Sequence, residues 1–389
     1  MAKEDYPILD GLDRASIATP CYILDLGALR RNLELLADVK QRVGCQILLS
    51  QKTFALFGVY PMLRWYLDGV SAGSVYEARL GHEEMGGDVH IMAPAYSEAD
   101  IQELQPYSTA VIFNAYAQWD RFRTTLAAAP KPISPGLRLN PEYSEAEKEI
   151  FSLGIYGARL GIRRREMDRL ALDGIEGFCF HKMGEQNAGM FERMLKAAEE
   201  RFGTFFPRVQ WLSFTGGHRL TGGDYDVDRF CRVFAAFRQA HPVRTVYLDP
   251  GEAVALNAGV LVASVLDIVP ADLPVVVLDI SAAAHMPDVL ELPYRPLVQG
   301  ADLPRRKSWT CRLAGLTSFS GDVIGEYSFD APLRIGDKLV FQDMANFTMV
   351  KNNHLNGLRL PTIATWDPAQ QNLRIVRSFD YGDFKNRLS

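Results

Sequence analysis

Short apolar segments alternate with amphipathic segments over the first two thirds of the chain, and this alternation restricts the fold more than any other feature. Eight apolar segments have strand-like length and end in small or polar residues. They span residues 46–50, 68–74, 89–94, 110–115, 135–140, 175–181, 209–217 and 245–251. Segments between them, such as residues 187–203 and 225–241, carry apolar residues three and four positions apart, which is typical of helices. Parallel strands joined by crossover helices are therefore expected. Eight repeats predict a closed (β/α)8 barrel, also called a TIM barrel, with a doubly wound open sheet as the alternative.

The pattern changes after Ala255, where strand-like segments follow one another with few helical stretches between them. These segments lie at residues 261–269, 275–281, 309–315, 337–343 and 346–350. They indicate a second, mainly β domain. An early strand candidate, TPCYILD at residues 19–25, precedes a helical segment at residues 26–43 and is compatible with either domain.

Composition excludes several classes of protein. Of the 389 residues 48% are apolar and 23% charged, which is ordinary for a soluble globular protein, and a net charge of −5 disfavours nucleic acid as a partner. Five scattered cysteines without a C-x-x-C pair indicate reduced thiols in a cytoplasm. The first eleven residues lack the apolar core of a secretory signal, and the longest apolar run, Gly259 to Val269, contains Asp267 and is too short to cross a membrane.

Functional residue types follow four of the predicted strands. Active sites of such barrels lie at the carboxyl ends of the strands, so these residues are expected to meet in one site. They are Lys52, then His181 and Glu185, then Thr215, Gly216 and Gly217, and finally Asp249 and Gly251. Each has an ordinary structural explanation by itself, since glycine pairs are common in turns and a histidine at a strand end is commonly a core residue.

Together these residues suit one ligand, pyridoxal 5′-phosphate. A lysine amine condenses with its aldehyde, a flat imidazole stacks on its ring, a glycine pair lets main-chain N–H groups approach its phosphate, and a carboxylate keeps its ring nitrogen protonated. A metal site built from His181, Glu185 and His218 is the competing interpretation. No H-E-x-x-H or similar close cluster in the sequence supports a metal.

Longer motifs resemble the carboxynorspermidine/carboxyspermidine decarboxylases. That family is a branch of the pyridoxal-phosphate-dependent decarboxylases with the alanine-racemase fold (fold type III), which also includes ornithine and diaminopimelate decarboxylases. The motifs include TPCYILD, DGVSAGSVYEARLG, LRLNPEYSE, FHKMGEQNA, PGEAVALNAG, HMPDVLELPYRP, SGDVIGEYSF and DMANFTMVKNNHLNG. The resemblance extends from Thr19 to Ile363. It implies a barrel over residues 27–258, a β domain made of residues 1–26 plus 259–389, and a homodimer with the active site at its interface.

The resemblance also implies roles for individual residues. Lys52 would hold the cofactor covalently, His181 would stack on its ring, and Asp249 would pair with the ring nitrogen. Gly216 and Gly217, with the Pro250-Gly251 turn, would bind the phosphate. Asp322 would enter the site from the other subunit. The positions that match the substrate side of the family are Glu185, His285, Asp288 and Glu291.

Five positions depart from the family pattern. Ser318 replaces a cysteine that donates a proton, and Asp249 replaces a longer glutamate. Thr215 replaces the first of three glycines, and Asn346-Phe347 stands where a tyrosine near the phosphate is expected. Gly184 stands where cysteine is frequent. We hypothesise that the Thr215 hydroxyl compensates for the phenol missing at Phe347.

The expected reaction is decarboxylation of an amino acid with an aminocarboxypropyl end, which yields the aminopropyl amine. Asp288, Glu291 and Asp322 would suit the ammonium groups of a polyamine. After loss of CO2 the α-carbon needs a proton, for which Ser318, a water held by it, Lys52 and His181 are the candidates. The alternatives are a decarboxylase of another aminocarboxypropyl metabolite in a specialised pathway and a non-catalytic cofactor-binding homologue. The long motifs disfavour an alanine-type racemase.

Overall fold

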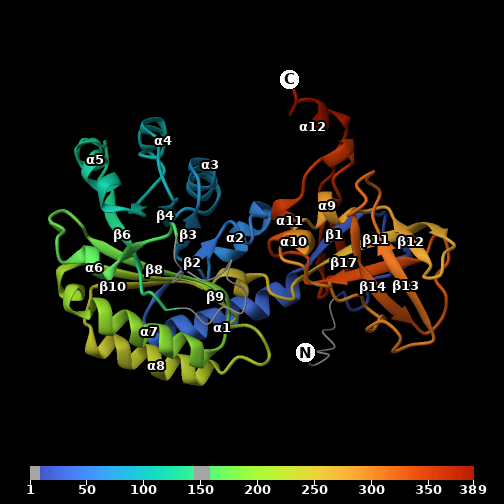
Figure 1. Ribbon diagram of the computed structural model, residues 1–389, viewed down its shortest axis with the longest axis horizontal. Helices are drawn as coiled ribbons and strands as arrows, with labels where there is room; N and C mark the ends of the chain where they lie inside the picture. The colour runs from blue at the N-terminus through green and yellow to red at the C-terminus, as the bar shows by residue number, and fades with distance from the viewer. Residues whose placement is uncertain (1–8, 144–157) are drawn as a thin grey trace. The chain divides into compact units, whose positions relative to one another are not determined.

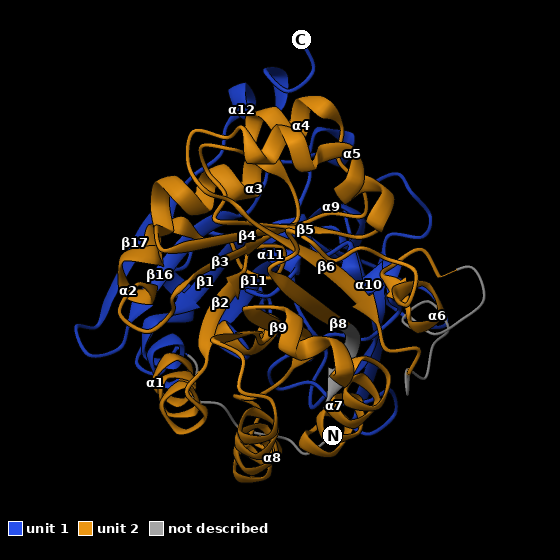
Figure 2. Cartoon of the chain, turned by 90° about the vertical axis from the view of Figure 1, so that its left-hand side faces the viewer, with its two compact units in different colours: residues 1–31, 255–389 blue, residues 32–254 orange. Residues whose placement is uncertain are grey.

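The computed structural model divides the chain into two compact units (Figure 2). The barrel unit comprises residues 32–254, and the sheet unit comprises residues 1–31 and 255–389. The structure describes residues 9–143 and 158–389, with the main chain but not the side chains of residues 182–186. Most of the segment on which the missing secretory signal was inferred (residues 1–8), and the last two residues of the LRLNPEYSE motif, lie outside the described residues.

Eight parallel strands close into a ring in the barrel unit (Figures 1 and 2). They are β2 (Gln46–Ser50), β3 (Gly69–Ala72), β4 (Asp88–Met92), β5 (Ala110–Phe113), β6 (Ser134–Asn140), β8 (Gly177–Gln186), β9 (Trp211–His218) and β10 (Thr245–Asp249). Pairing of β10 with β2 and of β5 with β6 completes the ring, and the two-residue β7 (Ile162–Arg163) pairs with β6 beside it. The predicted closed barrel is confirmed and the open sheet is wrong.

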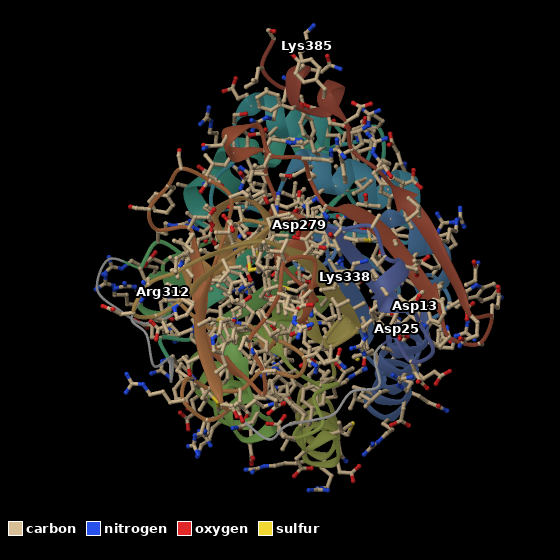
Figure 3. The ribbon with its side chains drawn as sticks, turned by 90° about the vertical axis from the view of Figure 1, so that its right-hand side faces the viewer. Asp13, Asp25, Asp279, Arg312, Lys338 and Lys385 are labelled. Carbon is tan, nitrogen blue, oxygen red and sulfur yellow. The ribbon has the colours of Figure 1, made fainter. Side chains whose placement is uncertain are left out.

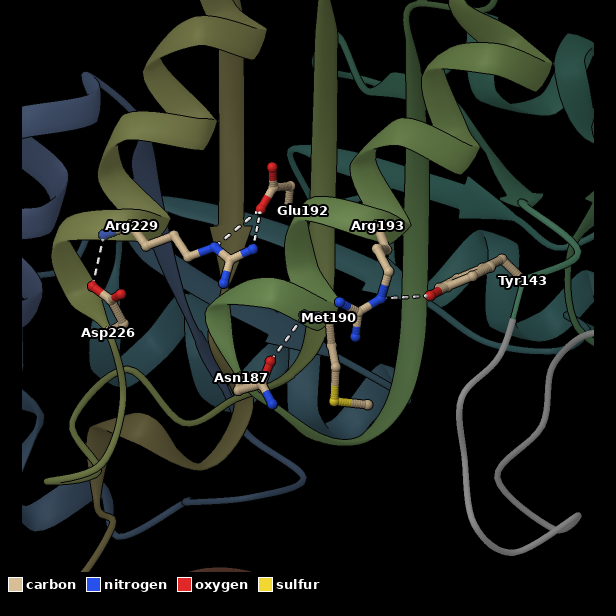
Figure 4. A network of polar contacts seen from close by, with 7 residues as sticks. All are labelled: Tyr143, Asn187, Met190, Glu192, Arg193, Asp226 and Arg229. Carbon is tan, nitrogen blue, oxygen red and sulfur yellow. Dashed lines mark hydrogen bonds and ion pairs between the residues drawn. The ribbon is translucent and has the colours of Figure 1, made fainter.

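Helices connect the strands and surround the ring (Figure 2). They are α1 (Leu26–Val43), α2 (Tyr60–Leu63), α3 (Val75–Leu80), α4 (Glu98–Glu103), α5 (Tyr116–Ala127), α6 (Arg164–Met167), α7 (Ala188–Phe202) and α8 (Val227–Ala240). Helix α7 begins where Asn187 accepts a hydrogen bond of 2.9 Å from the amide of Met190, and Asp226 caps α8 in the same way through Arg229 (Figure 4). Both helices match the apolar periodicity of the sequence.

Side chains of the barrel strands alternate between the outer helices and the barrel interior. Phe180 and Phe214 face outward, where their rings meet Phe202 of α7 and Phe234 of α8 at centroid distances of 5.8 and 5.7 Å. Cys179, next to Phe180, points inward, because its Sγ lies 3.6 Å from Met92 Sδ of β4 and because it clusters with Trp211. This alternation identifies which residues of β6, β8, β9 and β10 face the interior.

The sheet unit contains an eight-stranded sheet with short helices (Figure 1). Its strands are β1 (Cys21–Asp25), β11 (Gly259–Val269), β12 (Val275–Leu278), β13 (Trp309–Ala314), β14 (Val323–Phe329), β15 (Lys338–Gln342), β16 (Thr362–Asp367) and β17 (Asn372–Arg377). Its α-helices are α9 (Ala282–His285), α10 (Asp288–Glu291), α11 (Thr348–Lys351) and α12 (Tyr381–Lys385). The predicted mainly β domain is confirmed, but the strand-like segment predicted at residues 346–350 is wrong, since it forms a turn and the start of α11.

The early strand β1 belongs to the sheet unit. It pairs with β11 in antiparallel and with β16 in parallel orientation. The segment before it is fixed by Asp279, which accepts a hydrogen bond of 2.6 Å from Thr19 Oγ1, and by Lys338, whose Nζ donates to the carbonyl of Ala15 at 2.6 Å (Figure 3). At the end of β1, Asp25 accepts a hydrogen bond of 2.9 Å from the amide of Ala28.

Candidate active site

Lys52 follows β2 in a turn that the main chain closes tightly. The amides of Thr53 and Phe54 both donate to the carbonyl of Ser50, at 3.0 and 3.1 Å. Thr53 Oγ1 also lies 3.1 Å from the carbonyl oxygen of Gly251, which ties this turn to the turn after β10. A lysine is tolerated here because β2 ends at this point, so the amine of Lys52 stays accessible to solvent.

Burial lowers the pKa of the Lys52 amine. Its side chain is exposed by area, yet many protein atoms lie around the amine, so the ammonium form is poorly hydrated. The positive charge of Arg138 lowers this pKa further, whereas the carboxylate of Asp249 opposes the shift. A larger fraction of Lys52 is therefore the neutral, nucleophilic amine than in a surface lysine.

His181, Thr215 and Asp249 form one row across three adjacent strands. In the parallel register His181 of β8 lies opposite Thr215 of β9, which lies opposite Asp249 of β10. All three are buried, with exposures of 7%, 3% and 3%. His181 shares the inward face with Cys179, two residues earlier, and Thr215 Oγ1 lies 4.0 Å from Cys179 Sγ, so this row faces the barrel interior.

Burial shifts the pKa values of the two ionisable groups of this row, Asp249 and His181, in opposite directions. Burial raises the pKa of Asp249, and the positive charge of Lys52 and a hydrogen bond of 3.0 Å from the Gly251 amide lower it. Burial lowers the pKa of His181 well below its usual value, and Lys52 and Arg138 lower it further. His181 is therefore a neutral imidazole, and its buried Nδ1 has no hydrogen-bond partner within the described residues.

Of the predicted phosphate-binding glycines, Gly216 and Gly217 lie within the last residues of β9, and Gly251 begins the turn after β10. Gly216 has a φ of +119° and Gly251 a φ of +60°, conformations that favour glycine. A Cβ on Gly251 would lie 3.2 Å from the carbonyl oxygen of Gly216, so the end of β9 and the turn after β10 approach closely. The Gly251 amide already donates to Asp249, and it reaches a phosphate only by giving up that bond.

These residues fit pyridoxal phosphate. A buried carboxylate beside a lysine, a neutral imidazole with an unpartnered nitrogen and a glycine cradle are the groups that the cofactor requires. Glu185 lies within β8, which continues to Gln186, so the prediction that it follows the strand is wrong at this point. The strand is longer than predicted because Gln186 still pairs with His218 of β9. A shift of register between Lys182 and Gln186 makes this pairing possible.

Other predicted residues lie in the sheet unit, and three of them are on α9 and α10. His285 is 1% exposed, and burial lowers its pKa to about 4. Asp288 Oδ2 accepts hydrogen bonds from Tyr294 at 2.7 Å and Thr348 at 2.9 Å, whereas its Oδ1 is buried without a partner among the described residues. Glu291 forms an ion pair with Lys351.

Asp322 and Ser318 belong to one loop of the sheet unit. The Asp322 carboxylate accepts four hydrogen bonds, two from main-chain amides at the start of α9 and two from Thr317. Its side chain therefore anchors the loop to α9. Ser318 is exposed, and its Oγ accepts a hydrogen bond of 3.0 Å from Asn356 Nδ2.

Phe347 occupies a γ-turn. Its φ of +50° and ψ of −56° are unusual for a residue other than glycine, and the amide of Thr348 donates to the carbonyl of Asn346 across the turn. The adjacent Asn346 is 5% exposed, and neither atom of its amide has a partner in the described part of the chain. Strain of this kind is frequent at functional sites.

Arg138 is an interior residue that the sequence reasoning missed. The signal was present, since an arginine inside the apolar strand PGLRLN is as unexpected as the lysine after residues 46–50. The competing metal site stays untested, because the side chain of Glu185 lies outside the described residues; among the side chains that are described, no group of three metal-ligating residues occurs. No helix in the described residues is long and apolar enough to cross a bilayer.

Comparison with known proteins agrees with this fold. The family model for the pyridoxal-dependent decarboxylase, C-terminal sheet domain, matches residues 21–345. The fold and this family match thus define a pyridoxal-dependent decarboxylase. A carboxynorspermidine/carboxyspermidine decarboxylase from Campylobacter jejuni is 38% identical over 95% of this chain and 98% of its own. A carboxyaminopropylagmatine decarboxylase from Synechocystis is 37% identical over 98% of both chains.

A solved structure gives the same result. The crystal structure of carboxynorspermidine decarboxylase from Campylobacter jejuni, complexed with norspermidine, matches with a TM-score of 0.87 at 37% identity. The match covers 95% of this chain and 100% of that one. The chain belongs to the carboxynorspermidine/carboxyspermidine decarboxylase family.

Proposed function

We propose that this protein decarboxylates an amino acid with an aminocarboxypropyl end, of the carboxynorspermidine or carboxyspermidine type. The observation that carries the proposal is similarity over nearly the whole chain to decarboxylases named for such substrates. The reaction converts R–NH–CH2–CH2–CH(NH3⁺)–COO⁻ and one proton into R–NH–CH2–CH2–CH2–NH3⁺ and CO2. The carbon–carboxylate bond breaks, and the incoming proton takes its place on the α-carbon.

Pyridoxal 5′-phosphate is the cofactor in this proposal. Lys52 would hold it, Asp249 would pair with its ring nitrogen, and His181 would contact its ring face. Its phosphate would bind at Thr215, Gly216, Gly217 and the Gly251 turn, with Phe347 near it. When bound, the cofactor supplies an aldehyde that condenses with an amine and a ring that accepts the electron pair left by CO2.

The protein contributes nucleophilicity and proton transfer. The lowered pKa of Lys52 keeps a larger share of its amine in the neutral form, which is the form that would attack the aldehyde of the cofactor and recombine with it after product release. Ser318 Oγ accepts a hydrogen bond from Asn356 Nδ2 through one of its own lone pairs. Its hydroxyl proton is therefore free to be donated to the α-carbon, directly or through water. Neutral His181 is a poor acid, so Lys52, once released as an ammonium, is the second proton source.

The polyamine part of the substrate would meet carboxylates that differ in how far other protein groups already occupy them. Asp288 has a buried oxygen without a partner in the described residues, and we assign it the main contact with an ammonium group. Glu291 is neutralised by Lys351, and Asp322 holds its loop, so both contribute less than their charges suggest. Roles for His285 and Glu185 remain predictions from the family resemblance.

A second candidate is a different aminocarboxypropyl substrate. The Synechocystis relative is named for carboxyaminopropylagmatine rather than for a carboxylated spermidine, so the family as a whole tolerates more than one tail. Ser318, Asn346, Phe347 and Gly184 depart from the family pattern around the expected site. A non-catalytic homologue is disfavoured, because the sequence retains Lys52, His181 and Asp249.

We also propose a cytoplasmic homodimer with the active site at its interface. All five cysteines are free and buried, as expected in a reducing compartment. Light scattering would establish the dimer. If two chains share each site, mixing Lys52→Ala with Asp322→Ala chains would restore about a quarter of wild-type activity through mixed dimers. A monomer, or mixed chains that stay inactive, would contradict the shared site.

The test of function is a substrate panel. Purified protein loaded with cofactor is incubated with carboxynorspermidine, carboxyspermidine, carboxyaminopropylagmatine, ornithine, lysine and diaminopimelate, and CO2 and amine products are measured. We expect release from one of the first three compounds and none with Lys52→Ala. Release only from ornithine, lysine or diaminopimelate would overturn the proposed substrate class.

A further inference from the structure

The loop that contains Ser318 is fixed at its base and exposed at its tip. At the base, the Asp322 carboxylate accepts hydrogen bonds from Thr317 and from two main-chain amides at the start of α9. At the tip, residues 318–320 are all exposed. The hydrogen bond of 3.0 Å from Asn356 Nδ2 to Ser318 Oγ is therefore open to water, which competes with it. The position of the Ser318 hydroxyl then depends on how rigidly Asn356 is held.

Asn356 belongs to a tight turn with an unusual main chain. Its φ of +54° and the φ of +70° of Gly357 are both positive, a conformation that asparagine tolerates better than most residues other than glycine. At the start of the turn, the amide and the side chain of Asn353 donate to the carbonyls of two residues of α9, at 2.8 and 3.1 Å. The turn is thus bonded to the same helix that holds Asp322.

Phe384 of α12 packs against this turn. Its ring centroid lies 6.0 Å from that of His354, and a Cβ on Gly357 would lie 3.4 Å from its Cζ atom. His354 is 7% exposed, and its Nδ1 lies 2.9 Å from the carbonyl oxygen of Leu358. Phe384 therefore contacts the turn on both sides of Asn356 in the sequence.

Helix α12 has little other packing. None of its five residues, all of which the structure describes, is buried, and Figure 1 shows the helix apart from the strands of its sheet. A capping box of Asp380 and Asp383 and an ion pair of 2.7 Å between Arg377 and Asp383 hold its first turn, but so short a helix is not stable by itself in water. Tyr381 is 72% exposed, so half-buried Phe384 is the aromatic side chain through which α12 packs.

We propose that Phe384 is a positioning residue, which holds Asn356 so that Asn356 keeps the Ser318 hydroxyl where it donates a proton to the α-carbon. This inference rests on the proposed function and on the role assigned to Ser318 there. In that step the electron pair left by CO2 takes the hydroxyl proton, and Ser318 Oγ recovers a proton from water, so the serine is unchanged overall. A displaced hydroxyl delays this transfer. Protonation at the wrong carbon then yields, with water, an aldehyde and leaves the amino group on the cofactor.

The first test needs no substrate. Amide hydrogen exchange is followed by mass spectrometry in cofactor-loaded wild type, Phe384→Ala and Asn356→Ala. The amide of Asp322 donates to the carbonyl of Phe319 at 2.9 Å, and this bond opens more often once the tip of the loop is released. Peptides that cover residues 315–323 should therefore exchange about threefold or more faster in both variants.

Tyr381→Ala is the matched control, because it removes an exposed ring from the same helix, and it should exchange like wild type. Peptides that cover β2 should be unchanged in every variant. Unchanged exchange of residues 315–323 in Phe384→Ala would overturn the proposal. Faster exchange throughout the sheet unit, or failure of Phe384→Ala to fold, together with an unaltered loop in Phe384→Leu, would also overturn it, since Phe384 would then be a general structural residue.

The second test measures products with the substrate that the panel identifies. Phe384→Ala should lower kcat by about three- to tenfold and raise the ratio of aldehyde to amine, while the Kd of pyridoxal phosphate stays the same. Phe384→Leu, which keeps an apolar contact with the turn, should recover most of both properties. A loss of active protein alone would lower kcat and leave the product ratio unchanged, and that result would contradict a positioning role.

A double-mutant cycle tests whether Phe384 acts through Asn356. If it does, adding Phe384→Ala to Asn356→Ala should change the product ratio by less than about twofold, because the bond to Ser318 is already lost. Effects that multiply independently would contradict the proposal. If wild type releases no CO2 from any compound in the panel, the proposed function fails and this role fails with it, whereas an active enzyme with an unchanged product ratio in Phe384→Ala rejects the role alone.

Discussion

Asp249 Oδ1 accepts a hydrogen bond of 3.0 Å from the amide of Gly251, which ties the carboxylate at the end of β10 to the turn that follows. The carboxylate is nevertheless buried, and burial raises its pKa despite this bond and the positive charge of Lys52. The group that we assign to the ring nitrogen is therefore held in place at a cost to the stability of the cofactor-free protein.

That cost predicts a pH-dependent effect of Asp249→Asn. The folded-state pKa of Asp249 is above the unfolded value of about 3.9, so its contribution to stability is fully present below the unfolded pKa and is lost as pH rises through the folded pKa. In cofactor-free protein, the stability of Asp249→Asn relative to wild type should therefore increase as pH rises from acidic to neutral. Urea unfolding at several pH values measures this, and a difference that shrinks as pH rises would contradict it.

The same variant should lose activity. An amide cannot pair with a protonated ring nitrogen, so we expect kcat to fall by about a hundredfold or more. Asp249→Glu, which supplies the family's longer carboxylate, is the control and should retain far more activity than the amide. Steady-state kinetics on the identified substrate provide the comparison, and equal loss in both variants would argue for a packing effect.

Lys52 should react with aldehydes at a lower pH than an ordinary lysine. Burial and Arg138 lower its pKa from 10.5, and deprotonation is required for attack. The rate of covalent attachment of pyridoxal phosphate to stripped protein should reach half its maximum below pH 10.5. Nα-acetyl-lysine is the reference compound and Lys52→Ala the protein control. A midpoint equal to that of the reference would show that the amine is not perturbed.

Ser318 should limit return of the proton to the α-carbon. A serine hydroxyl is a much weaker acid than a thiol, so Ser318→Cys should increase kcat, and Ser318→Ala should lower it by about tenfold. Misplaced protonation yields an aldehyde, so the ratio of aldehyde to amine should fall in Ser318→Cys and rise in Ser318→Ala. Asn356→Ala tests the positioning bond to Ser318 Oγ. If aldehyde predominates even in wild type, the proposed reaction outcome is wrong.

Thr215 should contribute more to cofactor affinity than its position suggests. If its hydroxyl replaces the phenol missing at Phe347, Phe347→Tyr should barely change the Kd of pyridoxal phosphate in wild type. Thr215→Val should weaken binding by about tenfold, the typical effect of a lost hydrogen bond to a charged group. Titration of stripped protein measures both, and strong tightening by Phe347→Tyr alone would count against compensation.

An ion pair joins the two helices that follow β8 and β9. Arg229 of α8 donates to Glu192 Oε2 of α7 from Nε at 3.0 Å and from Nη2 at 2.7 Å (Figure 4). Both side chains are nearly half exposed, so screening limits the gain, and a double-mutant cycle with alanine should give about 0.5 kcal/mol of coupling. The coupling should decrease in 0.5 M salt, and a value above about 2 kcal/mol would mean that water is excluded from the pair.

Much of the fold was predictable because its information is local. The apolar periodicity of residues 187–203 and 225–241 yields α7 and α8, and the eight strand segments all form barrel strands. Closure of the ring depends on the β5–β6 pairing, which no local pattern encodes. The extension of β8 to Gln186 arises from a register shift against β9, which is likewise a property of the sheet rather than of the segment.

The positions of candidate site residues at strand ends were predictable from the sequence. The hydrogen bonds and ion pairs that these residues form with distant segments were less predictable. Lys52 and Asp249 follow directly from their positions after β2 and at the end of β10. The pairing of Glu291 with Lys351 and the four hydrogen bonds on Asp322 depend on segments distant in sequence. Arg138 was missed although the sequence shows a charge within an apolar strand, because only the structure shows that its side chain is buried.

The absorbance spectrum of purified protein, recorded with added pyridoxal phosphate before and after Lys52→Ala, tests the central claim most directly. The account predicts a visible band in wild type that borohydride abolishes by fixing the cofactor to one lysine, and no such band in Lys52→Ala. A wild-type protein that stays colourless with the cofactor, or a band that survives in Lys52→Ala, would contradict it.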